Sequence, residues 1–317
     1  MNRIAAPARP SVGAAKRGRS RQEIAEERLG FLYIAPWLLG FLIFILGPLL
    51  ASLYLSFTDY EVTLAPKWVG LANYAKAFFQ DDLTWVSLGN TAYYVFISVP
   101  LGLAASLLCA LLMDRKIWGV SGFRTLFYMP SIVPTVVTTL LWAYLLQPDY
   151  GLVNNLLAGI GINGPTWLNS VVWAKPALII MALWAGAGGS TMIIFLAGLQ
   201  GVPTELYEAA DVDGAAGMRK FFSITLPLLT PTIFFNLVVG IIASFQVFTQ
   251  AFVATQGGPG DATRFFVLHL YDQAFVDYRP GYASALAWIL FVIVLAFTVI
   301  QFAIARRWVY YESATKG

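Results

Sequence analysis

The chain has 317 residues and a net charge of +3; 58% of its residues are hydrophobic, 12% are charged, and its mean hydropathy is +0.69. A typical soluble domain has about twice this share of charged residues, so too few polar side chains remain here to cover a water-exposed surface. One cysteine, Cys109, excludes an intramolecular disulfide. With one histidine, His269, it leaves no His/Cys zinc site, and no Gly-rich phosphate loop followed by Lys-Ser or Lys-Thr indicates an ATPase. We expect no metal, cofactor or catalytic residue in this chain.

Six stretches without Asp, Glu, Lys, Arg or His predict six membrane-spanning helices. Each has about 22 residues or more, enough to cross the hydrocarbon core of a bilayer as a helix. The stretches are Phe31–Phe57, Leu88–Met113, Thr125–Leu146, Ala177–Leu199, Thr232–Val253 and Ser284–Ala305. The expected fold is an all-α polytopic membrane protein in which residues 29–310 form a six-span transmembrane domain.

The distribution of basic residues predicts the orientation of these spans. If both termini lie inside, the inner side also includes the 114–124 and 200–226 loops. These inner segments then hold 15 of the 20 Lys and Arg residues. Because basic residues accumulate in cytoplasmic loops, we expect both termini in the cytoplasm. Met1–Ser20, rich in Ala, Arg, Pro, Gly and Ser, are expected to be a disordered cytoplasmic tail, and Gln22–Glu27 are expected to lead helically into the membrane. Residues 1–28 then form the N-terminal cytoplasmic segment and residues 311–317 a cytoplasmic tail.

The inner loop between the fourth and fifth spans, residues 201–231, reads GVPTELYEAADVDGAAGMRKFFSITLPLLTP. Thr204 is the expected N-cap of a short helix, and Glu205 and Glu208 are expected in its first turn, where carboxylates suit the positive helix end. Gly214 can end this helix in a left-handed conformation, and a second short helix is expected over Gly217–Ile224. From these residues alone, an element that inserts into a cytoplasmic partner and a plain amphipathic loop helix are about equally favoured.

The loop resembles the EAA loop of bacterial ABC importer permeases, in their carbohydrate-uptake branch. The resemblance lies in the spacing of Glu208-Ala209-Ala210, then three residues, Gly214, nine residues and Ile224-Thr225-Leu226-Pro227. Weaker similarities, including Trp68–Tyr74 and Gly281–Ala285, extend this resemblance over about Arg28–Tyr310. It implies that the loop docks in a cleft of an ATPase subunit. The implied coupling residues are Glu205, Glu208, Ala209, Ala210, Asp213, Gly214, Ile224, Leu226 and Pro227.

The same resemblance implies the partners and the location of the protein. The partners would be a dimer of ATP-binding subunits, a second permease subunit that is a different chain, and an external solute-binding protein. No nucleic acid would be bound. The protein would be a non-enzymatic, multi-pass component of the bacterial plasma membrane. The expected function is to form half of the pathway for a di- or oligosaccharide, and a permease for glycerol phosphate or another small solute is the alternative.

Uncharged spans argue against an ion-coupled secondary transporter, the alternative from another class, because such proteins keep ionisable groups within the membrane. An intramembrane enzyme is disfavoured more strongly, since no His or Asp pair lies within a span. For a neutral cargo, Asn236, Gly240 and Ser244 recur every four residues and form a polar, small stripe, although ordinary helix packing explains such residues more often. The remaining pathway candidates are Trp184, Gln246 and Gln250. We expect most aromatic residues near the outer boundaries to form an interfacial belt; these are Tyr150, Trp167, Tyr271, Tyr278 and Tyr282.

Overall fold

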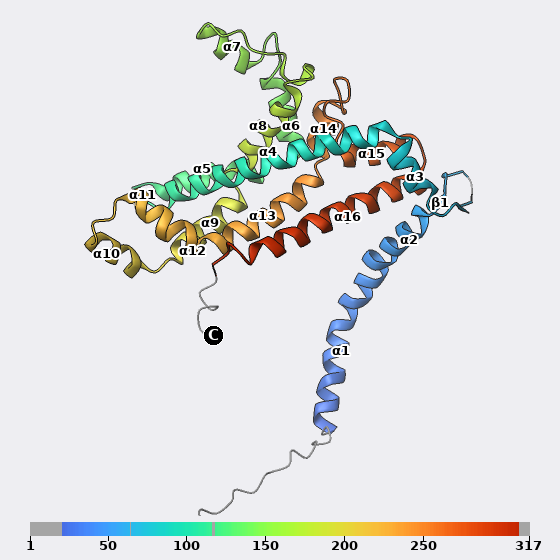
Figure 1. Ribbon diagram of the computed structural model, residues 1–317, viewed down its shortest axis with the longest axis horizontal. Coiled ribbons are helices and arrows are strands. Elements are labelled where there is room, and N and C mark those ends of the chain that lie inside the picture. The colour runs from blue at the N-terminus through green and yellow to red at the C-terminus, as the bar shows by residue number, and fades with distance from the viewer. Residues whose placement is uncertain (1–20, 64, 116–117, 311–317) are drawn as a thin grey trace, which may run out of the picture. The chain divides into compact units, whose positions relative to one another are not determined.

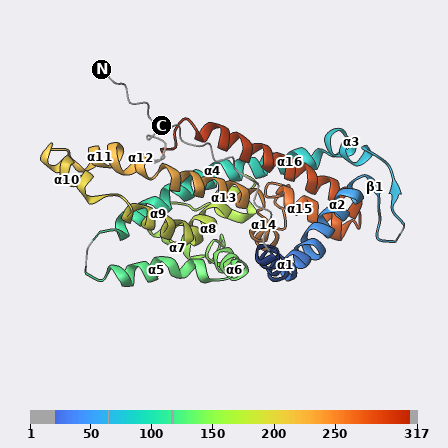
Figure 2. The ribbon, with the colours of Figure 1, turned by 90° about the horizontal axis from the view of Figure 1, so that it is seen from below.

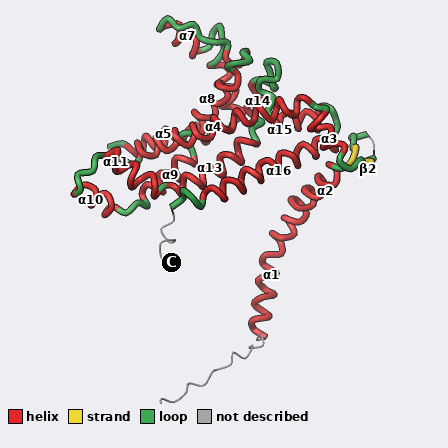
Figure 3. Tube along the Cα trace, in the orientation of Figure 1, coloured by secondary structure: helices red, strands yellow, loops and turns green. Residues whose placement is uncertain are grey.

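The computed structural model describes residues 21–63, 65–115 and 118–310 (Figure 1). The predicted disordered segment before residue 21 and the tail at 311–317 lie outside the described residues. The chain divides into two units, Met1–Ser52 and Leu53–Gly317. Helix dominates both, and within the described residues strand is confined to one short hairpin (Figure 3).

The described part of the first unit, from residue 21, is one long helical segment. Helix α1 (Arg21–Phe41) continues through a π turn (Leu42–Leu46) into α2 (Gly47–Ser56). Its apolar part, Leu29–Ser56, has 28 residues and is long enough to span a membrane, in agreement with the stretch predicted at Phe31–Phe57. No side chain described between residues 29 and 52 is buried, as expected for a helix whose apolar surface faces lipid or another subunit.

Three further predicted spans are continuous in the second unit. They are α4 (Asp82–Met113), the segment Thr230–Ala254 that contains α13 (Thr230–Phe245) and α14 (Thr249–Ala254), and α16 (Pro280–Ala305). Helix α13 packs against both α4 and α16, and the three run side by side in two views (Figures 1 and 2). Helix α4 also contacts α8 (Ala174–Gly186), α9 (Ser190–Gln200) and α15 (Phe266–Tyr271), which makes it the centre of the bundle.

The other two predicted spans are bent pairs of helices. The stretch at Thr125–Leu146 contains α5 (Val120–Ile132) and α6 (Thr135–Leu145), bent by 95°. The stretch at Ala177–Leu199 contains α8 (Ala174–Gly186) and α9 (Ser190–Gln200), bent by 50°. The described chain therefore has four continuous candidate spans, or six if each bent pair is one span.

Proline and close packing explain these two bends. Pro134 disfavours helical geometry at the preceding residue, and Val133 is extended, with φ −71° and ψ 131°. At the second bend Gly189 is extended, with ψ −152°. A Cβ on Gly188 would overlap the carbonyl of Phe127, so the close approach of the two bent pairs requires glycine there.

The remaining elements of the second unit gather mainly around the two ends of α4 (Figures 1 and 2). Near its beginning are β1 (Thr58–Asp59) paired antiparallel with β2 (Lys67–Trp68), α3 (Ala72–Phe79) and α15 (Phe266–Tyr271), which runs into a π turn at Asp272–Val276. Near its other end are α10 (Thr204–Val212), α11 (Gly217–Lys220), a π turn (Phe221–Thr225) and α12 (Leu226–Leu228). Helix α7 (Leu152–Gly159) and a 3₁₀ turn (Trp167–Asn169) connect α6 to α8.

Candidate functional site

The coupling loop predicted from the EAA pattern is an exposed helix with a defined stop. Helix α10 spans Thr204–Val212, and Glu205, Glu208 and Ala209 are exposed on it. It ends at Gly214, which has φ +68°, a left-handed conformation that glycine adopts without strain. The Ala215 amide donates to the Ala210 carbonyl at 2.9 Å, and the Gly214 amide donates to the Asp211 carbonyl at 3.0 Å. This pair of bonds is the Schellman motif, which confirms the role predicted for Gly214 as the end of the helix.

The beginning of α10 differs from the prediction. Pro203 occupies the N-cap position and no side chain caps the helix, so Thr204 is its first helical residue and the predicted Thr204 N-cap is wrong. Glu205 lies in the first turn as expected, but Glu208 lies beyond it. Pro203 has no side-chain acceptor, and the Leu206 amide in the first turn donates instead to the Pro203 backbone carbonyl at 3.3 Å.

The chain returns from α10 to the bundle through α11 and the π turn. Ile224 is half-buried in that turn, and Leu226 and Pro227 open α12. The Tyr207 hydroxyl and Thr225 Oγ1 lie 2.8 Å apart, and Lys220 forms an ion pair with Asp211. The predicted coupling residues therefore lie together in one helical loop at one end of α4. Asp213 lies at its turn, between α10 and Gly214.

The stripe predicted on α13 lines a cavity of about 170 Å³ between α4, α8, α9 and α13. Asn236, Gly240 and Ser244 come from α13, and the Asn236 side chain is 5% exposed. Its amide donates to the Thr232 carbonyl at 2.9 Å, a bond within the helix. The structure thus brings the three predicted stripe residues together on one small uncharged cavity.

Sequence reasoning missed a matching stripe on α4. Tyr94, Ser98, Gly102 and Ser106 line the same cavity and recur every four residues, so helical periodicity could have identified them. The Ser98 side chain is 7% exposed, and its Oγ has no hydrogen-bond partner among the described residues. Buried hydroxyls in proteins are normally hydrogen-bonded, so Ser98 is an exception among the described residues.

Gln246 and Gln250 line a neighbouring cavity of about 270 Å³, which shares Tyr94 and Ser244 with the first. The Tyr94 hydroxyl donates to Gln250 Oε1 at 3.1 Å. Trp184 lines neither cavity. Its ring stands edge-on to that of Trp142, with centroids 5.9 Å apart, so the structure does not bring this predicted residue to the stripe.

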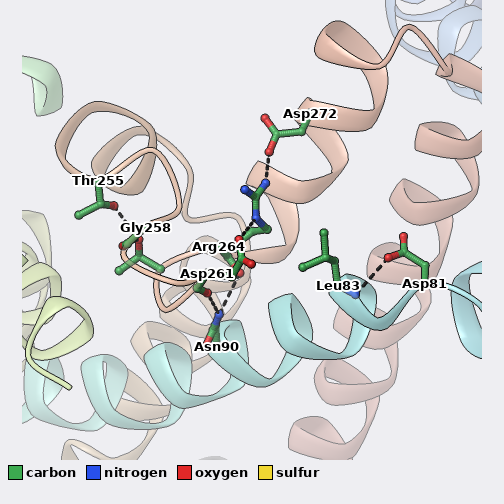
Figure 4. Close-up of polar contacts among 9 residues, drawn as sticks. Asp81, Leu83, Asn90, Thr255, Gly258, Asp261, Arg264 and Asp272 are labelled. Carbon is green, nitrogen blue, oxygen red and sulfur yellow. Dashed lines mark hydrogen bonds and ion pairs between the residues drawn. The ribbon is translucent and has the colours of Figure 1, made fainter. Parts of the chain in front are cut away.

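The end of α4 opposite the coupling loop holds a network of charged and polar groups. Asn90 donates through Nδ2 to the Asp261 carbonyl at 2.7 Å and to the Arg264 carbonyl at 3.2 Å (Figure 4). Arg264 in turn pairs with the carboxylates of Asp261 and Asp272. Burial lowers the pKa of Arg264, but these carboxylates outweigh it and raise the pKa above its ordinary value. The loop after α14 is thereby tied to α4.

Asp81, the N-cap of α4, is the second anchor at this end. Its Oδ1 accepts the Leu83 amide at 3.1 Å (Figure 4), and its Oδ2 accepts the Tyr282 hydroxyl at 2.7 Å. Burial raises the pKa of Asp81, but the bonds from Tyr282 and His269 outweigh burial and hold the pKa below its usual range. Tyr282 and Trp167 are 4% and 8% exposed, so the expectation of an interfacial belt is wrong for these two aromatic residues.

Among the residues that the structure describes, no group of three or more His, Cys, Asp or Glu side chains is placed to hold a metal ion. The described residues instead place an exposed helix at one end of the membrane bundle and uncharged cavities among its helices. These are features of a membrane transport protein.

Comparison with known proteins identifies the family. Residues 98–310 match the family described as "Binding-protein-dependent transport system inner membrane component", and the chain belongs to it. The resemblance to ABC importer permeases drawn from the EAA loop is therefore confirmed, and the chain is a multi-pass inner-membrane protein.

Two relatives and one solved structure illustrate the similarity. The chain is 42% identical over 305 residues to the probable ABC transporter permease protein YesP of Bacillus subtilis (strain 168), covering 95% of this chain and 98% of the relative. It is 34% identical over 290 residues to the trehalose/maltose transport system permease protein MalF of Thermococcus litoralis, covering 90% and 97%. It also resembles a chain of a bacterial alginate ABC transporter in complex with an alginate pentasaccharide-bound periplasmic protein, with a TM-score of 0.80, 25% identity, and 90% and 96% of the chains covered.

Proposed function

We propose that this chain is a non-catalytic permease subunit of an ATP-driven ABC importer and forms half of the pathway for a di- or oligosaccharide. A separate dimer of ATP-binding subunits hydrolyses ATP, a second permease of different sequence forms the other half, and an external solute-binding protein delivers the sugar. The observation that carries this proposal is α10, a short helix with exposed Glu205, Glu208 and Ala209, stopped by Gly214.

Helix α10 has the properties of a docking element. Its small Ala209 leaves room for a partner surface to approach, and Glu208 offers a charge. Large apolar side chains are exposed on and around the helix, with Val212 at 90% and Met218 at 70%. Exposed apolar side chains next to charged ones are typical of a protein interface. In this account the ATP-binding dimer closes on ATP, moves α10 and switches the pathway from inward-open to outward-open.

The proposal places α10 and both termini in the cytoplasm. In this organisation residues 1–28 form a cytoplasmic segment, residues 29–310 the transmembrane domain with the coupling loop at 201–231, and residues 311–317 a tail. The basic bias supports it, and so does the location of α10 and α11 at one end of α4 (Figure 1). A membrane-impermeant maleimide, applied to cells carrying Cys109→Ser, tests it. Lys76→Cys should be labelled in intact cells, and Met218→Cys only after permeabilisation; the reverse result would contradict the orientation.

A sugar is the cargo that the two cavities favour. None of the described residues that line them is charged, and they offer the hydroxyl, amide and aromatic groups that bind neutral polyols. Glycerol phosphate would call for a basic group, and neither cavity has one. The names of relatives support this choice, since they include a trehalose/maltose permease and an arabinooligosaccharide permease.

The cavity assignment is tested by Asn236→Leu and Ser244→Leu, each of which replaces a polar group by an apolar one. Both should reduce sugar-stimulated ATP hydrolysis and uptake. Val239→Leu on the exposed side of α13 is the matched control and should leave both unchanged. Unchanged uptake in both cavity variants would remove the stripe from the pathway.

The complex itself is tested by purifying the chain from its native membrane. Two ATP-binding subunits, a second permease and a solute-binding protein should accompany it, and candidate sugars should bind the last of these. Uptake should stop on ATP depletion and survive an ionophore. Uptake that an ionophore abolishes and ATP depletion does not affect would instead indicate the ion-coupled alternative.

A further inference from the structure

Helix α10 has two faces with different surroundings. Glu205, Glu208, Ala209 and Val212 follow helical spacing and are exposed; we call them the outer face. Tyr207, Ala210 and Asp211 have i, i+3, i+4 spacing on the opposite side, and we call them the inner face. Tyr207 and Ala210 are half-buried. The inner face turns toward the returning chain, whereas the outer face is available to a partner.

A hydrogen bond and an ion pair join the inner face to the returning chain. The Tyr207 hydroxyl lies 2.8 Å from Thr225 Oγ1, and Lys220 pairs with Asp211. Thr225 is 5% exposed, so its bond to Tyr207 is shielded, while Asp211 is exposed. A shielded hydrogen bond holds its geometry better than an exposed ion pair, which water and salt weaken. Of these two interactions, the Tyr207–Thr225 bond is the stronger constraint.

Thr225 is followed directly by Leu226–Leu229, the packed segment just before α13, which we call the root of α13. Leu229, four residues later, is fully buried in a cluster with Met113 of α4 and with Phe195 and Leu199 of α9. The Leu229 amide donates to the Thr225 carbonyl at 3.0 Å, so the two residues belong to one continuous helical path. That path continues into the α13 stripe that lines the cavity.

We propose that Tyr207 and Thr225 are positioning residues for energy coupling: their hydrogen bond fixes α10 to the root of α13, so that a displacement of α10 is delivered to the cavity-lining helix. Without the bond, α10 remains tethered by its two turns but can rotate on its partner without moving α13. Coupling between distant sites needs such a contiguous and stiff connection. This inference rests on the proposed function, and adds to it the residues that connect the docking helix to the pathway.

The test is transport by the complete complex reconstituted in liposomes, with sugar uptake and ATP hydrolysis measured together. Tyr207→Phe and Thr225→Val each remove one hydroxyl and keep the shape. Each should lower the sugar transported per ATP by about threefold to tenfold, the factor associated with one hydrogen bond. The double variant should be no worse than either single variant, because both changes remove the same bond.

Two further variants separate coupling from general damage. Thr225→Ser keeps the hydroxyl and should restore near-normal transport per ATP. Thr204→Val is the matched loss of a hydroxyl at an exposed position of α10 and should have no effect. Co-purification of the ATP-binding subunits shows whether each variant assembles, and hydrogen exchange of the α10 amides in the complex should be faster in Tyr207→Phe.

The outcomes also separate this inference from the proposed function. If both single variants assemble and transport as much sugar per ATP as wild type, the proposed role of the bond is wrong. The proposed function still stands in that case, provided that the wild type couples ATP hydrolysis to uptake. A double variant whose loss equals the product of the single losses would also overturn the role of the bond. A wild type that hydrolyses ATP without moving sugar would overturn both.

Discussion

His269 Nε2 lies 3.0 Å from Asp81 Oδ2, although 188 residues separate the two in the chain. The imidazole is 1% exposed, and the same carboxylate oxygen accepts the Tyr282 hydroxyl at 2.7 Å. One carboxylate at the start of α4 therefore joins α15 and α16 to it. This junction lies at the end of α4 opposite the coupling loop.

Asp81→Asn should destabilise the protein. The amide keeps the size of the side chain but has no charge to offer Tyr282 and His269, and losing partners at a buried site costs about 1–3 kcal/mol. Thermal unfolding of the detergent-solubilised chain should occur at a lower temperature. Asp82→Asn, at the adjacent exposed position, is the matched control and should shift the unfolding temperature less. Equal shifts for the two variants would contradict the role of this junction.

The lowered pKa of Asp81 also predicts that the stability of the fold depends on pH. The pKa of Asp81 is lowered from its ordinary value of 3.8 in the folded protein, chiefly because the bonds from Tyr282 and His269 outweigh burial. The carboxylate therefore stabilises the fold above pH 3.8, and this stabilisation is lost as pH falls through the lowered pKa. The stability difference between wild type and Asp81→Asn should shrink as the pH is lowered below about 4. A difference that is independent of pH would contradict this account.

Asn90→Leu should loosen the loop after α14. Asn90 donates to two backbone carbonyls, and its Oδ1 accepts a bond from Lys175 Nζ at 2.8 Å, so leucine leaves three groups without this partner. We expect a loss of about 1–3 kcal/mol and faster amide exchange at Asp261–Arg264. Leu88→Ala on the same helix is an apolar comparison, which should lower stability without selectively exposing this loop. Protection of the loop equal to wild type in Asn90→Leu would count against the network.

Ser98→Ala should separate stability from transport. The Ser98 hydroxyl has no partner among the described residues, so its removal should leave the unfolding temperature unchanged or higher while sugar-stimulated ATP hydrolysis falls. Thr91→Val is the informative comparison, because Thr91 Oγ1 accepts the Phe266 amide at 2.9 Å, and its loss should lower the unfolding temperature. Reduced stability with normal transport in Ser98→Ala would make Ser98 a structural residue.

Gly214→Val should distort the end of α10. A β-branched residue at φ +68° is strained, by roughly 1–2 kcal/mol or more, so the helix stop and the position of Glu208 should change. The chain should still insert in the membrane and hydrolysis by the partner should continue, with sugar moved per ATP reduced about tenfold. Gly217→Val, where an added Cβ meets no atom within 4 Å and φ is not positive, should transport normally. Equal coupling in both variants would contradict the role of the turn.

The uncharged stretches predicted the existence of the spans because a charge inside a bilayer is costly, and this local signal does not depend on the rest of the fold. Pro134 and Gly188 are visible in the sequence as residues that can interrupt a helix. The bend of 95°, however, depends on what packs against the broken helix, which the sequence alone does not reveal. Four-residue spacing predicted the α13 stripe, and the same spacing on α4 predicts its partner once the two helices are known to face each other.

The long-range pairs could not have been predicted in this way. Asp81 and His269, or Tyr94 and Gln250, have no periodic or spacing relationship, and only the packing of distant helices brings them together. The Tyr207–Thr225 pair is only partly predictable, since both residues lie within the loop that the sequence identified. Their contact depends on the π turn that orients Thr225, a local irregularity that hydrophobic patterns do not reveal.

The most direct test of the central claim is uptake of a labelled oligosaccharide by liposomes that contain the complete complex, with and without ATP on the side of α10, for wild type, Glu208→Lys and Glu208→Asp. Wild type and Glu208→Asp should accumulate sugar only with ATP. Glu208→Lys, inserted in the membrane to the same level, should accumulate at least about tenfold less, because a reversed charge at the docking contact opposes the partner. Normal ATP-dependent uptake by Glu208→Lys would contradict the claim that α10 delivers the energy for transport.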